Sequence, residues 1–514
     1  MGQMYLVTAS EMREYDNNTI EKIGIPACVL MERAALAAVH KIETYFGGSR
    51  TGKSVLIMAG VGNNGGDGLA VGRILTERGY EVELWCVGNL EKASGQWEQQ
   101  KKILDHYPVE WTEKPKKRSY DVLVDALFGV GLSRKVEGHY AEAVNLFGAL
   151  DGWKLALDVP SGIDSDTGQI CGCAVQADQT VAFGFCKRGL VLYPGCEYAG
   201  EVETADIGIP EQSFFGRKPE MYAYTGAVPE LLPKRKKDGN KGTFGKVLLV
   251  AGSENMAGAA VLAAKAAYRM GAGMVRVITH SRNRIILQEA VPEALYGTLA
   301  HLKEGLEWAD VIAIGPGLGT GTAAVCSLEQ VLMESGKPLL IDADGLNLLA
   351  QQPSLREMLA AQGKKGRNVI LTPHVGELSR LTGGSIADCR QNLAFFGMGL
   401  AAELHGVVAA KDARTMVCQE GHPVCVNVSG NHGMATAGSG DVLSGIIAAL
   451  LAQGLHAFDA ASLGVYLHGM AADAVTQKTG AYSCMAGDIA EEVGICCNNM
   501  VTVQPCGNDC TICL

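Results

Sequence analysis

The sequence predicts two α/β domains in succession, each built on a mainly parallel β-sheet with helices on both faces. Short apolar runs typical of strands alternate with helical segments from residue 54 to residue 183, and the alternation starts again at residue 246. The pattern breaks between residues 210 and 242, where four prolines and mixed charges leave no helical periodicity. Two glycine-rich segments, residues 60–68 and 433–441, each lead into an apolar helix. We therefore expect one ligand site in each domain.

The length and composition fit this organisation. At 514 residues the chain is too long for a single core, since domains of about 150 residues are typical. Apolar residues make up 47% of the chain, which allows large cores, and the formal net charge is -11. An acidic chain is a poor match for a protein that coats nucleic acid, because binding to phosphates requires clustered Lys and Arg. The basic run at residues 234–237 falls in the segment between the domains.

The expected helices and strands follow the same alternation in both halves. Helical residues 10–40 are divided by Pro26. Expected in the rest of the first half are strands at residues 54–59, 81–87, 121–125, 154–158 and 179–183, and a helix at 69–78. Expected in the second half are strands at residues 246–251, 274–279, 311–314, 338–341, 368–371 and 407–410, a hairpin after residue 410, and helices at 257–271 and 441–453.

The first glycine-rich segment stands where a strand ends and a helix begins, at the edge of a parallel sheet where ligands bind. Glycine permits a positive φ and close approach of the backbone to a ligand. Free N–H groups at a helix N-terminus attract an anion such as a pyrophosphate. A purely structural tight turn is the alternative interpretation.

Carboxylates follow two later strands of the same domain. Asp125 comes directly after residues 122–124, and Asp158 comes directly after residues 155–157. Because strands of a parallel sheet end at one edge, we expect both carboxylates to line one crevice. A helix cap is the alternative role for each. Asn64, Asp125 and Ser161 together offer hard oxygen ligands for a cation.

These motifs resemble the epimerase domain of the bifunctional NAD(P)H-hydrate repair enzymes. The resemblance is carried by residues 62–68, 125–129 and 158–162, and in the opening segment by Glu11, Met12, Arg13, Asp16, Met31 and Glu32. It implies a Rossmann-like three-layer sandwich over residues 1–218. The residues implied to bind the hydrated dinucleotide are Asn63, Asn64, Gly65, Gly66, Asp67, Gly129, Val130, Gly131, Leu132, Ser133, Arg134, Lys135 and Asp158. The resemblance further implies a potassium ion (K+) held by Asn64, Asp125 and Ser161.

Within this resemblance, Asp158 is the candidate for acid–base work. Hydrated NADH carries a hydroxyl at C6 of the reduced nicotinamide ring, next to the ring nitrogen. The nitrogen lone pair can help to expel the hydroxyl or to open the ring, and addition to the other face then inverts C6. A carboxylate that relays protons beside a fixed cation suffices for this reaction in principle.

The second glycine-rich segment combines a backbone anion site with a carboxylate. Gly438, Ser439 and Gly440 offer backbone N–H groups to a phosphoryl group during transfer. Asp441 is placed to remove a proton from a substrate hydroxyl. A helix cap by Asp441 is the structural alternative.

This segment resembles the anion hole and base of ribokinase-like kinases. Together with residues 241–253, 315–319, 342–344 and 371–377, it resembles the ADP- or ATP-dependent NAD(P)H-hydrate dehydratase. The resemblance implies a ribokinase-like three-layer α/β/α domain over residues 225–497, which uses Mg2+ with ADP or ATP to phosphorylate the C6 hydroxyl of the S hydrate. Asp441 would be the general base, and elimination of phosphate would restore NADH or NADPH. The residues implied to contact the hydrate are Ala259, Gly319, His374 and Asp441, and those implied to contact the nucleotide are Lys411, Asp412, Ala413, Arg414, Thr415 and Gly440.

The chain departs from this family at a few positions. Asp412 replaces a usual glycine, and its carboxylate would repel nucleotide phosphates. His432 stands where the family tends to have proline, and Ser439 stands where threonine is usual. Asp342 and Asp344 end a strand, where a magnesium role and a turn role are both open.

Two other functions remain open at this point. The second domain would suit a ribokinase-like kinase that phosphorylates a small hydroxyl compound, such as a vitamin precursor, beside a non-catalytic N-terminal scaffold domain. A chain without catalytic activity is the other alternative, although Asp125, Asp158 and the acidic net charge speak against it.

The remaining features concern location and partners. The chain has 16 cysteines, mostly scattered as in a reduced cytoplasmic protein, but residues 498–514 form a Cys-rich tail that we expect to be flexible. Cys506, Cys510 and Cys513 in it lack an evident fourth metal ligand. No signal peptide, lipidation motif or membrane-spanning run of about 20 apolar residues is recognisable. We expect hydrated NADH and NADPH and ADP or ATP as partners, no nucleic acid or membrane, and a homo-oligomer.

Overall fold

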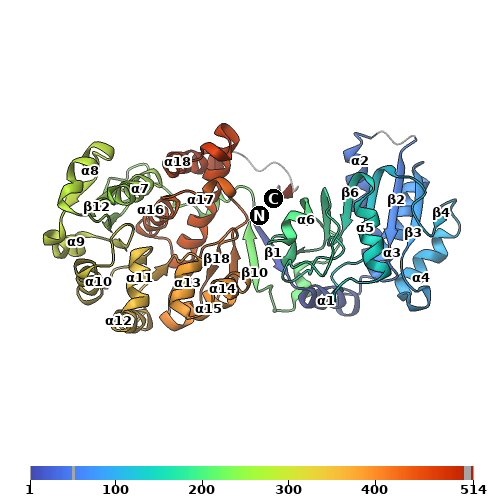
Figure 1. Cartoon of the computed structure of the whole chain (residues 1–514), viewed down its shortest axis with the longest axis horizontal. Helices are drawn as coiled ribbons and strands as arrows, with labels where there is room; N and C mark the ends of the chain where they lie inside the picture. Colours follow the sequence, from blue (N-terminus) through green and yellow to red (C-terminus); the bar gives the residue numbers. More distant parts are fainter. Residues whose placement is uncertain (1, 49–51, 503–510, 513–514) are drawn as a thin grey trace. The chain divides into compact units, whose positions relative to one another are not determined.

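The computed structural model describes residues 2–48, 52–502 and 511–512 of the chain. They form two compact units that meet in the sequence between Met221 and Tyr222. Met4–Met221 belong to the first, here called the N unit, drawn from blue to green in Figure 1. The C unit, drawn from green to red, begins at Tyr222 and also takes in the residues before Met4. Both units alternate strands with helices, so the predicted α/β fold class is confirmed.

The N unit is a three-layer sandwich. Its strands are β1 (Gln3–Val7), β2 (Ser54–Ala59), β3 (Glu81–Cys86), β4 (Glu110–Thr112), β5 (Ser119–Ala126), β6 (Asp151–Leu157), β7 (Gln179–Phe183), β8 (Cys186–Lys187), β9 (Glu201–Ala205) and β20 (Thr511–Ile512). Its helices are α1 (Ala9–Asn17), α2 (Ala27–Tyr45), α3 (Asn63–Glu77), α4 (Gly95–Leu104), α5 (His139–Gly148) and α6 (Gly195–Ala199).

The main sheet of the N unit has the order β9-β7-β6-β5-β2-β3-β4, and all these strands are parallel. Side chains alternate between its faces, as the two-residue period of a strand requires. Val55 and Ile57 of β2 share a core with α2 and α3, whereas Leu56 and Met58 share a core with α5. Helices therefore cover both faces and leave the carboxyl ends of the strands free for a site.

The C unit is also layered. Its strands are β10 (Met221–Tyr224), β11 (Lys246–Val250), β12 (Met274–Ile278), β13 (Leu295–Gly297), β14 (Val311–Ile314), β15 (Leu339–Ile341), β16 (Val369–Leu371), β17 (Val407–Ala410), β18 (Met416–Cys418) and β19 (Val424–Val426). Its helices are α7 (Ala257–Arg269), α8 (Arg284–Ala290), α9 (Leu302–Trp308), α10 (Thr322–Glu334), α11 (Asp344–Gln351), α12 (Pro353–Lys364), α13 (Val375–Thr382), α14 (Ile386–Gln391), α15 (Leu393–Leu404), α16 (Ser439–Ala452), α17 (Ala457–Thr479) and α18 (Ala486–Thr502).

The strands from β13 through β12, β11, β14, β15 and β16 to β17 are parallel, and the hairpin strands β18 and β19 extend the sheet in antiparallel fashion. The long apolar helices α7, α16, α17 and α18 pack against one another, and α9 to α15 form a second group. Figure 1 draws the two groups on opposite sides of the strands. No helix among the described residues has the length and apolar character needed to cross a bilayer.

The structure differs from the sequence prediction at a few boundaries. Helix α3 begins at Asn63 rather than at residue 69, and α16 begins at Ser439 rather than at 441, so each glycine-rich segment already forms the first helical turn. β10 lies in the stretch expected to lack regular structure. Helix α18 continues to Thr502, past the expected start of the tail at residue 498. Cys506, Cys510 and Cys513 lie outside the described residues.

Candidate active sites

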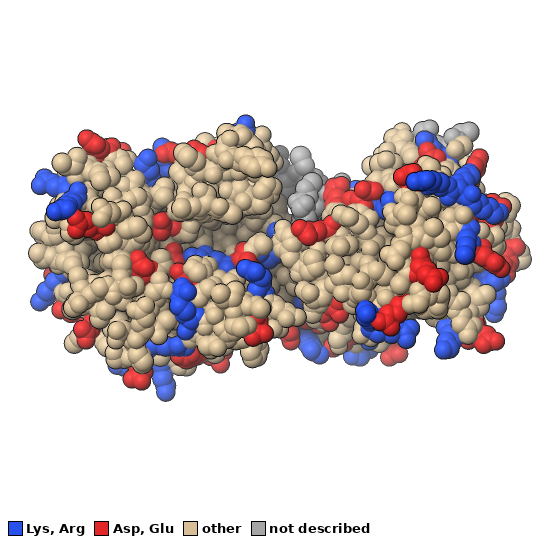
Figure 2. All heavy atoms as spheres, in the orientation of Figure 1, with Lys and Arg blue, Asp and Glu red and all other residues tan. Residues whose placement is uncertain are grey.

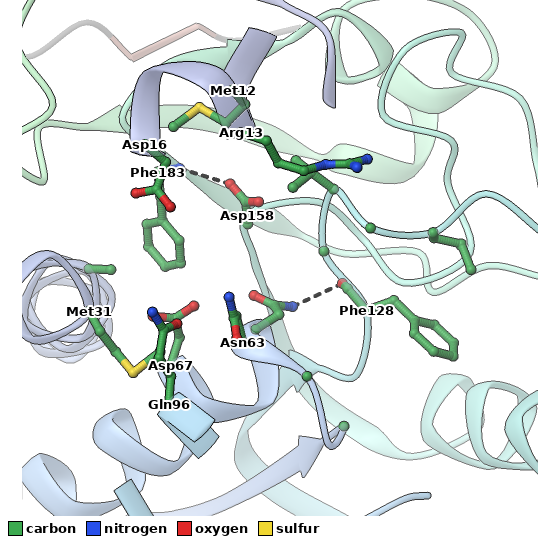
Figure 3. Close-up of a pocket in the computed structure, with 18 of the residues that line it drawn as sticks. Met12, Arg13, Asp16, Met31, Asn63, Asp67, Gln96, Phe128, Asp158 and Phe183 are labelled. Atoms are coloured by element: carbon green, nitrogen blue, oxygen red, sulfur yellow. Dashed lines mark hydrogen bonds between the residues drawn. The ribbon is translucent and has the colours of Figure 1, made fainter. Parts of the chain in front are cut away.

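The N unit contains a cavity of about 690 Å³ at the carboxyl ends of its central parallel strands. Figure 3 shows side chains from α1, α2, α3 and the strand ends pointing into it. Of the predicted substrate residues, those lining the cavity are Asn63, Asn64, Asp67, Gly129, Val130, Gly131, Leu132, Ser133, Arg134 and Asp158. Gly65, Gly66 and Lys135 do not line it: the two glycines are buried in α3, and Lys135 is exposed and pairs with Glu137.

The glycines of α3 have different physical roles. Gly62 precedes the helix in an extended conformation and lines the cavity with Asn63 and Asn64, so the N-terminus of α3, where the first N–H groups have no partner within the helix, lies at the cavity. Gly65 lies against the preceding turn, where an added methyl group would come within 1.8 Å of the backbone oxygen of Gly60. At Gly68 the methyl group would meet the side chain of Ala126 at 2.6 Å. Gly65 and Gly68 therefore serve close packing of α3 on β2 and β5, and Gly62 lies at the open end of the helix.

We expect Gly65→Ala to destabilise the N unit by about 1–3 kcal/mol, because the methyl group would displace backbone. Loss of hydrogen-exchange protection in β2 and α3 is the suitable measurement, since a chain of two units need not unfold in one step. The matched control is Gly62→Ala, where nothing lies within 4 Å of the added methyl group. Equal protection in the two variants would contradict this account of Gly65.

Asp158 occupies a strained position directly after β6. Its φ is +67°, in the left-handed region that a non-glycine residue rarely adopts. Its Oδ1 accepts hydrogen bonds from the backbone N–H of Phe183 at 3.1 Å and from the ammonium of Lys187. Strain of this kind persists only where neighbouring contacts impose it, which is common at functional sites.

Two further carboxylates, Asp16 of α1 and Asp67 of α3, line the same cavity. Figure 3 shows both with Asp158 around one opening. Burial raises the pKa of Asp16, an effect opposed by Lys187 and increased by Asp158. Burial raises the pKa of Asp67 well above its ordinary value, and the charges of Asp158 and Asp16 raise it further. The surroundings of Asp67 therefore favour its protonated form.

The three predicted cation ligands are linked by hydrogen bonds, Asn64 and Ser161 through the backbone of Phe128 and Ser161 directly to Asp125. Ser161 donates from its hydroxyl to Asp125 Oδ1 at 2.6 Å and from its backbone N–H to Oδ2 at 2.7 Å. Burial raises the pKa of Asp125 to about 6, against the opposing hydrogen bonds from Ser161 and Leu127. Asn64 donates to the backbone oxygen of Phe128 at 2.9 Å, while its buried Oδ1 has no hydrogen-bond partner among the described residues. A buried amide oxygen without a donor, on a residue linked through Phe128 to a hydroxyl and a carboxylate, fits a hard cation.

In the C unit, Asp441 lies in the first turn of α16. Gly438 precedes the helix with φ +91°, and the backbone N–H groups of Ser439 and Gly440 follow at the helix N-terminus. Burial raises the pKa of Asp441 to about 6, with a further rise from Asp342 and an opposing effect of Lys411. The site therefore joins an anion-binding helix end to a carboxylate that is a usable base near neutral pH.

A buried cluster of charges centres on Lys411, which follows β17. Lys411 Nζ donates to Asp342 Oδ1 at 2.8 Å, and the hydroxyl of Ser444 donates to Asp342 Oδ2 at 2.7 Å. Burial opposes the charge of Lys411, but Asp342 and Glu377 raise its pKa above the ordinary value. Because both oxygens of Asp342 are occupied, this carboxylate positions Lys411. A methyl group at Gly440 would lie 3.3 Å from Lys411 Nζ, so the ammonium lies beside the helix end.

His374 has a clear structural role. Its Nδ1 accepts from the backbone N–H groups of Gly376 at 3.0 Å and Glu377 at 3.3 Å, so it caps α13. Its own backbone N–H donates to Glu377 Oε2 at 2.8 Å. Burial raises the pKa of Glu377 to about 7, against the effect of Lys411. Since half of the His374 side chain stays exposed, at 55%, capping does not exclude contact with a substrate.

The other predicted hydrate contacts, Ala259 and Gly319, follow the neighbouring strands β11 and β14. Gly319 donates its backbone N–H to Asp344 Oδ2 at 2.7 Å, which gives Asp344 a turn role. A methyl group at Gly317 would lie 2.9 Å from Ala259 Cβ, so α7 and the 315–319 loop are in contact. A cavity of about 330 Å³ adjoins this loop and is lined by Ser253 and Leu318 among other residues.

Residues 411–415 form the turn between β17 and β18. Asp412 Oδ2 lies 3.3 Å from Arg390 Nε, an ion pair that neutralises the carboxylate expected to repel phosphates. Arg414 and Thr415 are buried, whereas Asp412 and Ala413 are more accessible. The predicted nucleotide residues are thus contiguous with Lys411, and through it they lie beside Gly440.

Several charged or polar residues that the structure places in these sites were missed by the sequence reasoning. They are Lys187, Glu377, Arg390, Ser444 and His468, the last with its Nε2 3.3 Å from Ser439 Oγ. Glu377 could have been found as the third residue after His374, the spacing of a capping box. The others carry no signal in a single sequence, because only the tertiary fold brings them to the site.

Comparisons with known proteins agree with both halves of this description. A family described as YjeF-related protein N-terminus matches residues 27–189, and one described as NAD(P)H-hydrate dehydratase matches residues 247–494. The bifunctional NAD(P)H-hydrate repair enzyme Nnr of Moorella thermoacetica is 38% identical over 515 residues, 95% of this chain and 96% of that protein. The enzyme of the same name from Escherichia coli is 33% identical over 493 residues, 94% of this chain and 92% of that protein. An ADP/ATP-dependent NAD(P)H-hydrate dehydratase from Bacillus subtilis, crystallised with ATP/Mg2+, is 29% identical with a TM-score of 0.47 and covers 53% of this chain and 95% of its own.

Proposed function

Because the chain belongs to the family of bifunctional NAD(P)H-hydrate repair enzymes, we propose that its two units repair one damaged coenzyme. The N unit interconverts the R and S hydrates of NADH and NADPH at C6 of the nicotinamide ring. The C unit dehydrates the S form to NADH or NADPH with ADP or ATP, through phosphorylation and elimination. This is the repair reaction that the sequence motifs predicted.

The carboxylate-lined cavity of the N unit is the observation that supports interconversion of the hydrates. Its 690 Å³ is the size of a site for a small-molecule cofactor. The open helix end formed by Gly62 and Asn63 suits the pyrophosphate of a dinucleotide, and Asp158 lies across the cavity as the acid–base group. Breaking and re-forming the C6–O bond needs proton transfer to and from the hydroxyl, which a carboxyl group within reach of the ring can supply.

We further propose that Asn64, Asp125 and Ser161 hold a potassium ion in this unit. Their donor atoms are all oxygens, and Asn64 Oδ1 lacks a partner among the described residues. The bound ion supplies a fixed positive charge beside the cavity. The residues themselves keep the 127–131 loop in place, since Ser161 Oγ accepts from the backbone N–H of Phe128 at 2.9 Å.

In the C unit, Asp441 takes the proton of the C6 hydroxyl while that oxygen attacks the terminal phosphorus of the nucleotide. The backbone N–H groups of Ser439 and Gly440 and the ammonium of Lys411 stabilise negative charge on the phosphoryl oxygens. Phosphorylation makes the C6 oxygen a good leaving group, so the ring nitrogen can expel phosphate and restore the reduced ring. The contacts proposed for the hydrate are Ala259, Gly319, His374 and Asp441, and those proposed for the nucleotide are Lys411, Asp412, Ala413, Arg414, Thr415 and Gly440.

The charge around Lys411 supports a magnesium ion carried with the nucleotide. Asp342, Glu377 and Asp441 each influence Lys411, so three carboxyl groups face a single ammonium. Mg2+ with nucleotides is usually held by the phosphates and one or two carboxylates. Both oxygens of Asp342 are occupied by Lys411 and Ser444, so Asp342 is not such a ligand. The ion, when bound, supplies neutralising charge at the phosphates.

The experiment that tests this function uses the separated R and S hydrates of NADH. Without nucleotide, each epimer should convert to the mixture, as followed by chromatography. With Mg2+ and ADP or ATP, both should return reduced-nicotinamide absorbance. Recovery of the S form alone would contradict the role of the N unit. Absence of recovery together with phosphate transfer to a vitamin precursor would favour a kinase with a non-catalytic N-terminal scaffold. Replacing K+ by tetramethylammonium should slow only the interconversion.

We expect Asp412→Gly to lower the KM for ADP or ATP by up to about fivefold, the range of an exposed ion pair. Loss of the carboxylate leaves the Arg390 guanidinium, 3.3 Å away in the native pair, free to attract phosphates. Arg390→Ala should raise the same KM, because Asp412 then repels the nucleotide. Steady-state rates at varied ADP measure both. Shifts of the same sign would refute this account of the pair.

The partners and location stay predictions. On the face drawn in Figure 2, Lys and Arg side chains are interspersed with Asp and Glu, which supports small-molecule partners rather than nucleic acid. We propose a cytoplasmic homo-oligomer without a membrane partner. We propose domain limits of 1–218 and 225–497, a division that the change of unit after Met221 supports.

A further inference from the structure

Lys187 is a buried cation beside the cavity of the N unit. None of its surface is exposed, and its Nζ donates to the Asp158 carboxylate and to the backbone oxygen of Phe183, the latter at 2.7 Å. The pairing of β8 with β1 places Lys187 opposite Val7 and fixes its backbone. An ammonium taken out of water is costly unless a charged partner and further acceptors surround it. The geometry therefore commits this side chain to Asp158.

The two oxygens of Asp158 differ in their surroundings. Oδ1 accepts from Lys187 and from the backbone N–H of Phe183, whereas no described hydrogen bond reaches Oδ2. Oδ2 lies 3.5 Å from the position of a methyl group on Gly129, in the loop that lines the cavity. The backbone of Asp158 is held by its N–H bond to Val181 at 2.8 Å. One oxygen is therefore anchored, and the other remains available to a ligand.

Asp67, on α3, lies within the electrostatic influence of the same ammonium. It lines the cavity, and Figure 3 shows it across the opening from Asp158, beside Met31 and Gln96. Its pKa is raised well above the ordinary value by burial and by Asp158 and Asp16, against the effect of Lys187. The other cations that line the cavity, Arg13 and Arg134, are exposed. Among the described residues that line the cavity, Lys187 is thus the buried positive charge, and it forms an ion pair with Asp158.

We propose that Lys187 is the positioning residue that anchors Oδ1 of Asp158, so that Oδ2 of Asp158 accepts a proton while Asp67, across the cavity, donates one. This inference rests on the proposed interconversion of hydrates. It assigns the donation and the acceptance of the proton to two different carboxyl groups, which the family resemblance does not do. Asp67 and Asp158 then act as the donor and acceptor of one reaction, with Lys187 acting through Asp158.

The steps balance in protons and electrons. Asp67 gives its proton to the C6 hydroxyl as the C6–O bond breaks, and the ring nitrogen lone pair forms a C6=N double bond while water leaves. Water then adds to the other face of C6, the electrons of the double bond return to nitrogen, and Asp158 takes the proton released. One proton has left Asp67 and one has reached Asp158. Transfer of that proton from Asp158 back to Asp67 through water in the cavity restores the site. In the S-to-R direction the two carboxyl groups exchange roles.

The test measures R-to-S conversion by the full chain without nucleotide, from about pH 3 to about pH 10 at roughly half-unit steps, a range that begins below the usual carboxyl pKa of about 4 and includes raised values. Lys187→Met should lower kcat by about 100-fold or more with little change in KM, and should move the acidic limb of the rate profile to higher pH. The reason is that this variant lacks the ammonium that pairs with the carboxylate of Asp158. Asp67→Asn should lower kcat to a similar extent and remove the alkaline limb, since the amide has no proton of that acidity to lose.

Controls separate this inference from the proposed function and from misfolding. Lys101→Met removes an exposed lysine of α4, paired with Asp105, and should leave rate and profile unchanged. If the wild-type chain does not interconvert the hydrates, the proposed function fails. If it does, a Lys187→Met profile with unmoved limbs overturns the inference, whatever its rate. If Lys187→Met loses hydrogen-exchange protection in β7, the Asp67→Asn profile decides: a retained alkaline limb overturns the inference.

Discussion

Asp441→Asn should abolish nucleotide-dependent recovery of NADH, with a fall in kcat of about 10³-fold or more, while interconversion of the R and S hydrates continues at the wild-type rate. Removal of a general base typically costs 10²- to about 10⁴-fold. Asp441 is the general base assigned to this step, so we expect the upper part of this range. The measurement is the return of reduced-nicotinamide absorbance from the pure S epimer, with ADP or ATP and Mg2+.

The pH dependence of the wild-type enzyme provides a second check on Asp441. Burial and Asp342 raise the pKa of Asp441 to about 6. A raised pKa means that the ionised base is present above pH 6 and is lost as the pH falls through that value. Dehydration should therefore lose rate progressively below about pH 6, at a pH where an ordinary aspartate would still be ionised.

The matched control for Asp441→Asn is Asp459→Asn. Asp459 is an exposed acidic residue in the first turn of α17, where it has the same favourable interaction with a helix N-terminus. If Asp441 served only as such a helix cap, both variants should show small and similar losses of stability with dehydration retained. If the Asp441→Asn variant dehydrated the S epimer at the wild-type rate, Asp441 would not be the general base.

How far the sequence predicted the sites depended on where each residue lies in the chain. Asp158 and Asp441 could be found because each is next to glycines at the end of an apolar run, and the carboxyl end of a parallel strand is a place of known geometry. Lys187 could not be found in this way. It lies in the two-residue strand β8, held by β1 from the opposite end of the N unit's sequence, and nothing near residue 187 indicates that pairing.

The same distinction explains the remaining differences. Asn63 was expected in a loop, because five glycines among residues 60–68 disfavour a helix. Tertiary packing overrides that propensity, since only glycine lets α3 approach Gly60 and Ala126. Asp412 looked unfavourable for phosphate binding because Arg390, its partner, lies 22 residues earlier in α14. Local motifs therefore predicted which groups react, and long-range contacts determine which charges accompany them.

Asp158→Asn should abolish interconversion of the hydrates, again by about 10³-fold, and leave dehydration of the S epimer intact. Asn suits this test because it tolerates the left-handed φ of +67° better than other side chains of similar shape. The rate of R-to-S conversion without nucleotide is the measurement. Asp151→Asn, an exposed position at the start of the same strand, is the control and should retain the wild-type rate.

Stability distinguishes the chemical role of Asp158 from a structural one. Asp158→Asn leaves the buried ammonium of Lys187 without its nearest counter-charge, which should cost up to about 3 kcal/mol, tempered by Asp16 and Asp67 nearby. Adding Lys187→Met removes that unpaired charge. The double variant should therefore recover hydrogen-exchange protection in β6 and β7 while remaining inactive. If the second change instead restored interconversion, Asp158 would matter only as a partner for Lys187, and the proton would have to move through another group of the cavity.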